Sequence, residues 1–308
     1  MRRFGVYLRK VRLPIYTFLI LGIFLAVGRP YGAESVWNHV FSFFGLGDFS
    51  SCADQYPAAV HILNVGKADC ILIECEGHRM LVDGGTPDCG ERIIRYLKQR
   101  GTPHLEYVVN THPDEDHVGG LKYVLESIPV EKFLVSEIRP ELVPTDTAYT
   151  DTMNTLRKKG LSPIIAKAGN EFSLGGMNIH VVGPVSPGSS TNNSSIVLLL
   201  RYGDIRFLLT GDAEQEEEQT LLSAQTNLTA DVLKVGHHGS STSTSLEFLN
   251  AVHPKFAAIS VGYDRNKLPK IDVLKRLYDA NVETYRTDVD GTIIFLTDGK
   301  TIKVVTEK

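Results

Sequence analysis

Residues 111–120 read THPDEDHVGG, and five of these ten residues are His, Asp or Glu. The apolar residues Tyr107, Val108 and Val109 come before them and predict a buried strand that ends where the polar residues begin. Residues 120–128 have a helical pattern, so regular structure holds both ends of the loop. Neutral imidazole nitrogens and carboxylate oxygens are the groups that bind a divalent cation. The pattern H-x-D-x-D-H directly after a hydrophobic strand therefore favours a metal site over an ordinary polar turn.

Three further polar clusters show the same arrangement. Each follows an apolar stretch that predicts a strand: DGG at 83–85, GD at 211–212 and HHG at 237–239. Taken singly, Asp83 is also typical of a turn, Asp212 of a helix N-cap and His238 of an ordinary loop. Catalytic groups collect at the edge of an α/β sheet where strands end, so the four clusters together favour one shared site.

Strands and helices alternate in both halves of the chain, which predicts an α/β protein with two sheets and helices outside them. We call residues 111–120 the metal loop. Besides the strand that leads into this loop, we expect strands at 60–65, 70–75, 79–82, 131–136, 164–168, 177–182, 195–202, 205–210, 232–235, 257–261, 292–296 and 301–305. We expect helices at 91–100, 120–128, 150–159, 214–224, 245–252 and 271–280. Two of the turns, at Gly203-Asp204 and Asp298-Gly299, predict hairpins.

The N-terminus combines five basic residues within its first twelve positions with an apolar run at residues 15–27. This order is typical of a secretory signal peptide or of a short uncleaved membrane anchor, and a buried helix is the alternative. Residues 31–33 form a poor cleavage site, so the anchor stays open beside the signal. We expect residues 1–33 to be the signal or anchor, 34–56 a linker and 57–308 the globular domain. The expected location is therefore extracellular or at the cell surface, with membrane association through residues 15–27.

The charge of the chain is distributed unevenly. The whole chain has 32 basic and 36 acidic residues. Residues 1–33 hold six of the basic residues and none of the acidic ones, which leaves 26 against 36, a net charge of −10, for the remainder. A domain with this net charge has no overall attraction for a polyanion, so nucleic acid could bind only through a local basic patch or through bound metal ions. The one obvious basic cluster, Arg265, Lys267 and Lys270, is either a solvated surface or a contact for substrate phosphate.

Four cysteines occur, at positions 52, 70, 75 and 89. Their spacing matches no zinc motif. Cys70 and Cys75 are five residues apart on one expected strand, so they face opposite sides of the sheet and should not pair. We interpret the cysteines mainly as small buried side chains, with a Cys52–Cys89 disulfide as the alternative for two of them.

Taken together, these motifs resemble the metallo-β-lactamase superfamily, and within it the hydrolase domain of the DNA-uptake protein ComEC and its free-standing relatives. The resemblance covers residues 57–308. It rests on LNVGKAD at 63–69, LVDGG at 81–85, THPDEDHVGGL at 111–121, NNSSIVL at 192–198, LLTGD at 208–212 and LKVGHHGS at 233–240. It implies an αββα four-layer sandwich with two divalent ions, Zn²⁺ or Mn²⁺, bound between the sheets.

The resemblance also implies a role for individual residues. The expected metal ligands are His112 and Asp114 for the first ion, Asp116 and His117 for the second, Asp212 between the two, and His237, or less favourably His238, to complete the second site. Asp116 would orient the attacking water, and His238, if it is not a ligand, would donate to the leaving group. The remaining expected site residues are Asn193, Ser240 and Ser241 as substrate contacts and Asp69 and Asp83 as lining residues. A helix N-cap is the alternative for the Ser/Thr run at 240–243.

This chain departs from the family pattern at two places. Most members have His where this chain has Asp114, and they have a third His for the first ion where this chain has Asn192-Asn193. A site richer in oxygen is harder and accepts manganese as readily as zinc. The ComEC branch usually shows Gln-Gly where this chain has Lys67-Ala68, which changes the substrate contacts expected of that loop.

The expected function is that of an exported metal-dependent phosphodiesterase or nuclease, acting on DNA, as in competence and DNA uptake, or on a smaller phosphodiester. Two adjacent cations activate water and hold both oxygens of an in-line displacement. The acidic body favours the smaller ester. The alternatives are hydrolysis of a β-lactam or lactone, which the missing third His disfavours, and a non-catalytic metal-bound binding module.

Overall fold

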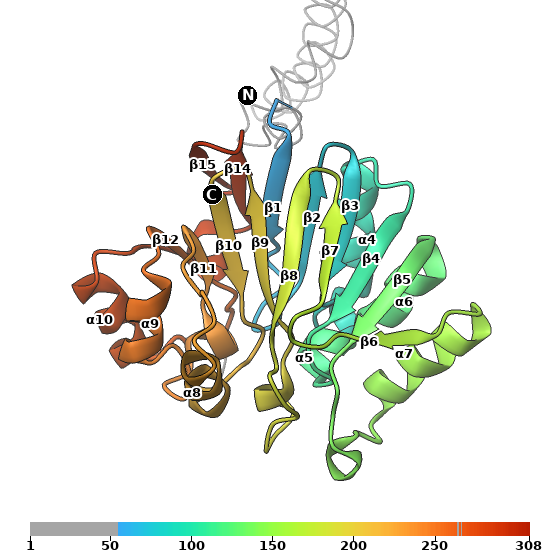
Figure 1. Cartoon of the computed structure of the whole chain (residues 1–308). Coiled ribbons are helices and arrows are strands. Elements are labelled where there is room, and N and C mark those ends of the chain that lie inside the picture. Colours follow the sequence, from blue (N-terminus) through green and yellow to red (C-terminus); the bar gives the residue numbers. More distant parts are fainter. Residues whose placement is uncertain (1–54, 264, 266) are drawn as a thin grey trace, which may run out of the picture. The chain divides into compact units, whose positions relative to one another are not determined.

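The computed structural model describes residues 55–263, 265 and 267–308. An eight-stranded and a seven-stranded sheet pack face to face, with helices covering the outer face of each (Figure 1). This arrangement confirms the expected αββα sandwich. Helices α4 (Gly90–Gln99), α6 (Leu121–Ser127) and α7 (Thr147–Lys158) cover the first sheet, and α8 (Gln215–Ser223), α9 (Leu246–Val252) and α10 (Ile271–Asp279) cover the second.

The strand order of each sheet places the two halves of the chain in different layers. The first sheet has the order β15 (Ile302–Thr306), β14 (Ile293–Thr297), β1 (Ala58–Ile62), β2 (Ile71–Cys75), β3 (His78–Val82), β4 (Leu105–Asn110), β5 (Val130–Val135) and β6 (Pro163–Ile165). The second has the order β13 (Glu283–Arg286), β12 (Phe256–Ile259), β11 (Val232–Lys234), β10 (Ile205–Leu209), β9 (Val197–Tyr202), β8 (Met177–Gly183) and β7 (Glu171–Leu174). The C-terminal hairpin β14–β15 returns to the first sheet and pairs with β1.

Strand β2 shows why the sheets are buried on both faces. Ile71, Ile73 and Cys75 point into the core between the two sheets. Leu72 and, just before the strand, Cys70 point into the separate core beneath the helices. The alternation follows from the two-residue period of a strand and confirms that Cys70 and Cys75 face opposite sides.

The direction of the strands brings the polar clusters to one edge. Strands β3, β4 and β5 run parallel in the first sheet, as do β10, β11 and β12 in the second. The carboxyl ends of parallel strands meet at the same edge of a sheet, and this is where ligands bind in α/β proteins. The clusters that begin at Asp83, Thr111, Gly211 and Gly236 follow β3, β4, β10 and β11.

Four of the α-helices and strands were not expected from the sequence, among them the short helix α11 (Thr287–Asp290). Strands β7 and β13 are sheet-edge strands, and the sequence ETYR of β13 lacks the apolar run by which the other strands were predicted. The metal loop was expected to be irregular, but it contains a short helix, α5 (Glu115–Val118). The expected hairpins β9–β10 and β14–β15 are confirmed.

Several expectations concern residues 1–54, which lie outside the described part: the signal or anchor at 1–33, the apolar run at 15–27 and most of the linker at 34–56. Among the residues that the structure describes, no helix is long and apolar enough to cross a bilayer. Cys89 carries a free, buried thiol that donates to the carbonyl oxygen of Val65 over 3.2 Å, and Cys52, its expected alternative partner, lies outside the described part.

Candidate metal centre

Backbone hydrogen bonds hold three of the loops that carry the site residues together. The amide of Gly84 donates to the carbonyl of His117 over 2.7 Å, and the amide of Asp69 donates to the carbonyl of Asp116 over 3.1 Å. Gly120 packs directly on Gly84 and leaves no room for a Cβ atom there. The glycines of the DGG and HVGG motifs therefore allow the loops after β3 and β4 to touch.

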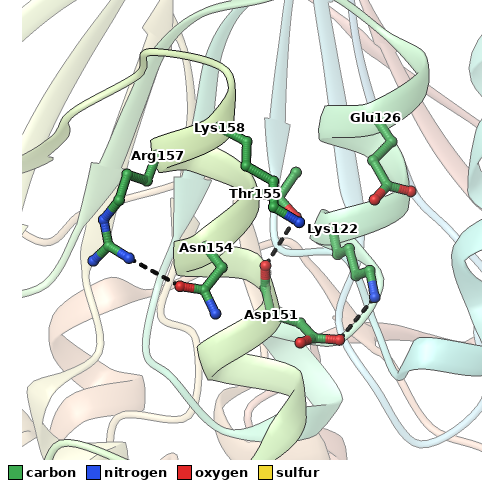
Figure 2. Close-up of a pocket in the computed structure, with 7 residues that line it drawn as sticks. All are labelled: Lys122, Glu126, Asp151, Asn154, Thr155, Arg157 and Lys158. Atoms are coloured by element: carbon green, nitrogen blue, oxygen red, sulfur yellow. Dashed lines mark hydrogen bonds and ion pairs between the residues drawn. The ribbon is translucent and has the colours of Figure 1, made fainter.

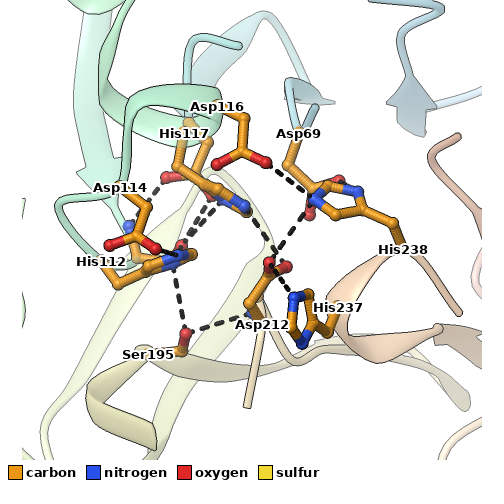
Figure 3. A network of polar contacts seen from close by, with 12 residues as sticks. Asp69, His112, Asp114, Asp116, His117, Ser195, Asp212, His237 and His238 are labelled. Atoms are coloured by element: carbon orange, nitrogen blue, oxygen red, sulfur yellow. Dashed lines mark hydrogen bonds and ion pairs between the residues drawn. The ribbon is translucent and has the colours of Figure 1, made fainter. Parts of the chain in front are cut away.

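The ring of His117 is oriented by Asp83. Its Nδ1 lies 2.8 Å from Asp83 Oδ2. Its Nε2 faces Asp212, as Figure 3 shows, and lies 3.3 Å from Asp212 Oδ1. Asp83 also accepts the amide of Thr111 over 2.8 Å and the hydroxyl of Thr111 over 2.7 Å, so its carboxylate is fixed. Because Asp83 accepts the Nδ1 proton, the lone pair of His117 Nε2 faces the centre of the site.

His238 is oriented in the same way by a backbone carbonyl. Its Nδ1 lies 2.8 Å from Ser260 O, an atom that only accepts, so Nδ1 carries the proton. Its Nε2 lies 3.4 Å from Asp116 Oδ2 and 3.5 Å from Asp212 Oδ2. The ligand atoms of Asp116, His117, Asp212 and His238 all lie within 4.8 Å of one another. These four side chains are the strongest candidates for one metal ion.

The sequence ranked His237 above His238 as the last ligand, and the geometry favours the reverse. The side chain of His237 is 23% exposed, and its Nδ1 lies 3.3 Å from Glu214 Oε1 while its Nε2 is 3.8 Å from Asp212. Both histidines have positive φ angles, 47° and 53°, in a tight turn after β11. This left-handed turn aims the second ring inward and the first ring outward.

His112 is the third histidine of the centre. Its Nδ1 lies 3.2 Å from Thr111 Oγ1 and 3.3 Å from Ser195 Oγ, and its Nε2 lies 3.8 Å from Asp114 Oδ2. The hydroxyl of Thr111 donates to Asp83, so it can accept from His112. Ser195 Oγ also accepts the amide of Asp212 over 3.1 Å. The lone pair of His112 Nε2 is thereby turned towards Asp114 and the inside of the site.

Four buried atoms test whether these residues fit a metal. Among the residues that the structure describes, Nε2 of His112, His117 and His238 and Oδ1 of Asp212 have no hydrogen-bond partner. Buried polar atoms are rarely left unpaired, since each costs about 1–3 kcal/mol. Imidazole nitrogens and a carboxylate that lie close together in a buried place are the ligand set that a divalent cation requires. The residues therefore fit a metal.

The electrostatics of the cluster agree with this fit. Burial alone would raise the pKa of Asp212, but His238 and His117 hold it well below its usual range. Burial lowers the pKa of His112, and the adjacent His117 lowers it further, so the neutral ligand form is favoured. Burial opposes the charged form of His117, yet Asp212 and Asp83 raise its pKa well above the ordinary value. The two carboxylates thus attract a positive charge to the place where a cation would replace that proton.

Two lysines adjoin the centre. Lys234 Nζ lies 3.0 Å from Asp69 Oδ2, and both side chains are 1% exposed. Asp69 Oδ1 in turn lies 3.7 Å from His238 Nδ1, so the Lys234–Asp69 ion pair lies beside the His238 ring. Lys67 Nζ lies 2.5 Å from Asp116 Oδ2 on the accessible side of the cluster. Asp69 was expected to line the site, whereas no role was predicted for Lys234 or Ser195, because neither stands in a recognisable ligand pattern.

The three residues expected to bind substrate lie around the cluster. Asn193 Oδ1 accepts the amides of Glu214 and Glu217 at the start of α8, over 3.1 and 3.4 Å, so its structural role is that of a helix cap. The hydroxyl of Ser240 lies 3.0 Å from Thr242 Oγ1, and Ser241 is exposed in the same turn after His238. The two serines remain proposals as substrate contacts.

A separate pocket of about 300 Å³ lies on helices α6 and α7 (Figure 2). Its polar side chains pair with one another: Lys122 Nζ lies 2.7 Å from Asp151 Oδ2, and Arg157 donates to Asn154 over 3.0 Å. None of the lining residues belongs to the metal cluster. We assign no function to this pocket.

Comparisons with known proteins agree with the fold and with the family that the sequence resembles. A family model described as the metallo-beta-lactamase superfamily matches residues 63–263. ComE operon protein 3 of Bacillus subtilis (strain 168) is 32% identical over 254 residues, which cover 76% of this chain and 32% of that protein. Recombination protein 2 of Haemophilus influenzae is 32% identical over 241 residues, which cover 76% of this chain and 28% of that protein. The match thus spans about a third of the length of these relatives.

Solved structures of low sequence identity share the fold. The diiron β-hydroxylase CmlA from Streptomyces venezuelae has a TM-score of 0.52 at 14% identity and covers 79% of this chain and 54% of its own. The metallo-beta-lactamase fold protein YhfI from Bacillus subtilis has a TM-score of 0.50 at 11% identity and covers 77% of this chain and 99% of its own. With its family match, its αββα layers and its cluster of His and Asp side chains, the chain belongs to the metallo-β-lactamase superfamily, in which its curated relatives include competence proteins.

Proposed function

We propose that the chain is an exported, metal-dependent phosphodiesterase whose substrate is DNA or a related phosphodiester. The observation that carries this proposal is a set of three histidines whose Nδ1 atoms are engaged while their buried Nε2 atoms have no hydrogen-bond partner, those of His117 and His238 lying beside Asp212 and that of His112 beside Asp114. We infer two ions: one held by Asp116, His117, Asp212 and His238, and a weaker one held by His112 and Asp114 with Asp212 shared.

The ligand set favours a hard cation and a phosphate substrate. Beside His112, the first site offers the carboxylate of Asp114, which is 39% exposed, in place of a second imidazole. Oxygen ligands suit Mn²⁺ as well as Zn²⁺. Divalent ions bound here would supply Lewis acidity at the phosphate and lower the pKa of water. The names of two curated relatives, a recombination protein and a competence protein, support DNA as the substrate.

The chain's own residues would act on the accessible side of the cluster. Asp116 is 18% exposed while His117, Asp212 and His238 are almost completely buried, so Asp116 is the carboxylate that substrate and water can reach. His238 and His117 hold the pKa of Asp116 well below its ordinary value against the effect of burial, so it is ionised and can orient a water molecule. Lys67, 26% exposed beside it, offers an ammonium group to a phosphate oxygen.

A substrate comparison tests the proposal. The full chain, stripped of metal and then supplied with Mn²⁺ or Zn²⁺, is assayed with bis-p-nitrophenyl phosphate and with the β-lactam nitrocefin. We expect metal-dependent turnover of the phosphodiester, its loss in Asp212→Asn and its retention in Asp204→Asn, an exposed turn residue. Turnover of nitrocefin alone would establish the β-lactam alternative. Turnover of neither, with metal bound, would leave a binding module.

Export is a separate part of the proposal, since the basic residues and apolar run of the first 33 positions support it. A reporter enzyme that is active only outside the cytoplasm is fused to the C-terminus of the full chain and of a chain that lacks residues 2–33. We expect activity from the first fusion only. Equal activity, or none from either, would refute export through this segment.

A further inference from the structure

The loop between β12 and α10 is attached at both ends to the metal centre. At its start, the carbonyl oxygen of Ser260 holds His238 Nδ1 at 2.8 Å. At its end, the amide of Lys270 donates to the carbonyl of Gly239 over 2.8 Å. Both contacts involve the HHG turn that follows β11. The loop therefore begins and ends beside the residues that carry the last metal ligand.

The loop also touches the turn that carries Lys67. Gly262 lies so close to this turn that a Cβ atom there would come within 2.7 Å of Gly66 Cα and 2.9 Å of Lys67 N. Lys67 Nζ in turn contacts Asp116 of the metal cluster. Gly262 is thus packed against the backbone of the turn whose Lys67 side chain reaches the metal cluster, and Tyr263 is the next residue of the loop.

The side chains that the loop presents to solvent combine an aromatic ring with two cations. Tyr263 is 100% exposed, and Arg265 and Lys267 are exposed as well. Residues 262–270 contain three basic residues and one acidic residue, in a body whose net charge is −10. The loop thus offers a fully exposed aromatic ring and two exposed cations within five consecutive positions.

We propose that Tyr263, Arg265 and Lys267 form a strand-binding arm, in which the ring of Tyr263 stacks on an unpaired base and the two cations contact the phosphates beside the scissile bond. Exposed aromatic rings combined with basic groups are how proteins bind single-stranded nucleic acid without reading its sequence. The inference rests on the proposed phosphodiesterase function and narrows its substrate to a polynucleotide strand, because only a polymer offers an unpaired base and further phosphates to the arm.

The kinetic test compares a short single-stranded DNA with bis-p-nitrophenyl phosphate on the full chain. We expect Tyr263→Ala to lower the ratio of kcat/KM for DNA to kcat/KM for the small ester by about tenfold, the size of one base–aromatic stack. Tyr263→Phe keeps the ring and should keep the ratio. The matched control is Tyr278→Ala, which removes a tyrosine that is 81% exposed on α10. Ratios that are equal for the wild type and Tyr263→Ala would overturn the arm.

The charged half of the arm is tested by salt dependence. Each phosphate contact on a single strand contributes about 0.7 to the slope of log affinity against log salt concentration. Fluorescence anisotropy with labelled DNA should therefore show a slope about 1.4 smaller in Arg265→Ala/Lys267→Ala than in the wild type, with Lys303→Ala, another exposed lysine, as control. An unchanged slope would refute the phosphate contacts.

The outcomes separate the arm from the proposed function. Turnover of the small ester without binding or cleavage of DNA would refute the arm and leave the phosphodiesterase standing. DNA binding that weakens in Tyr263→Ala, without turnover of either substrate, would support the arm and refute the enzyme. DNA binding that neither arm variant changes would place the nucleic-acid contact elsewhere on the chain and overturn the arm.

Discussion

Substitution of Asp83 by Asn should weaken metal binding although Asp83 is not itself proposed as a ligand. Its carboxylate accepts four donors: the amide and hydroxyl of Thr111 at 2.8 and 2.7 Å, His117 Nδ1 at 2.8 Å and Asn110 Nδ2 at 3.3 Å. Asn fits the backbone here, because the φ angle of 59° is one that Asn tolerates well. The amide of Thr111 cannot reverse, so the carbonyl oxygen of the new Asn must stay beside it.

The NH₂ group of the new side chain then faces His117 Nδ1. His117 has to accept at Nδ1, which moves its proton to Nε2, the atom that lies 3.3 Å from Asp212 and would otherwise bind the cation. Loss of a partner that orients a ligand typically costs 10–100-fold in metal affinity. Because the substitution imposes the wrong tautomer on His117, we expect a loss of metal affinity at the upper end of this range, about 100-fold or roughly 2.7 kcal/mol.

The assay is a competition titration of Zn²⁺ between the full chain and a chromophoric chelator. Asp204→Asn makes the same chemical change at an exposed turn and should bind like the wild type. A thermal unfolding curve of metal-free Asp83→Asn establishes that the variant is folded. An affinity of Asp83→Asn equal to that of the control would refute the reasoning, because His117 would then need no defined tautomer.

Three further predictions concern single side chains. His238→Ala should lose Zn²⁺ in the same titration, whereas His237→Ala should retain it; the reverse result would restore the ligand assignment expected from the sequence. Lys234→Met leaves Asp69 buried without its cation and should lower the free energy of unfolding, measured with urea, by about 3–5 kcal/mol. The double variant Lys234→Met/Asp69→Leu should be less destabilised, because no charge is then left buried. A loss below about 1 kcal/mol in Lys234→Met would contradict the pairing. Burial raises the pKa of Glu217 to about 7, so its protonated form stabilises the fold below about pH 4.5 and that stabilisation is lost as the pH rises to about 7. Glu217→Gln should therefore be more stable than the wild type at pH 8, by up to about 3 kcal/mol, and equal at pH 4; equal unfolding midpoints at both pH values would exclude the effect.

The layers of the fold and the location of the site follow from patterns that are local in the sequence. The apolar runs that precede Asp83, Thr111, Gly211 and Gly236 are real strands, and their ends lie at one edge because parallel strands share a direction. The edge strand β13 was missed because its polar residues Glu283–Arg286 form a strand only through pairing with β12. Its conformation is set by a neighbour in space and not by its own side chains.

The finer assignments within the site depend on contacts that the sequence does not display. His237 and His238 are adjacent residues of the same type, so their sequence does not distinguish them. The left-handed turn alone determines which ring is buried. Lys234 was unremarkable as the last residue of a short strand, yet it pairs with Asp69, which is 165 positions earlier in the chain. Ser195 lies against His112 in the same way, across 83 positions.

The central claim is that the converging atoms of His112, His117, His238 and Asp212 bind metal, and the most direct test is the metal content of the purified chain. Mass spectrometry with an inductively coupled plasma counts the Zn and Mn in the full chain after reconstitution and removal of excess metal, beside Asp212→Ala. We predict two ions per chain in the wild type and at most one in the variant, because Asp212 serves both sites. The absence of bound metal from the wild type after reconstitution would contradict the account and leave only the fold.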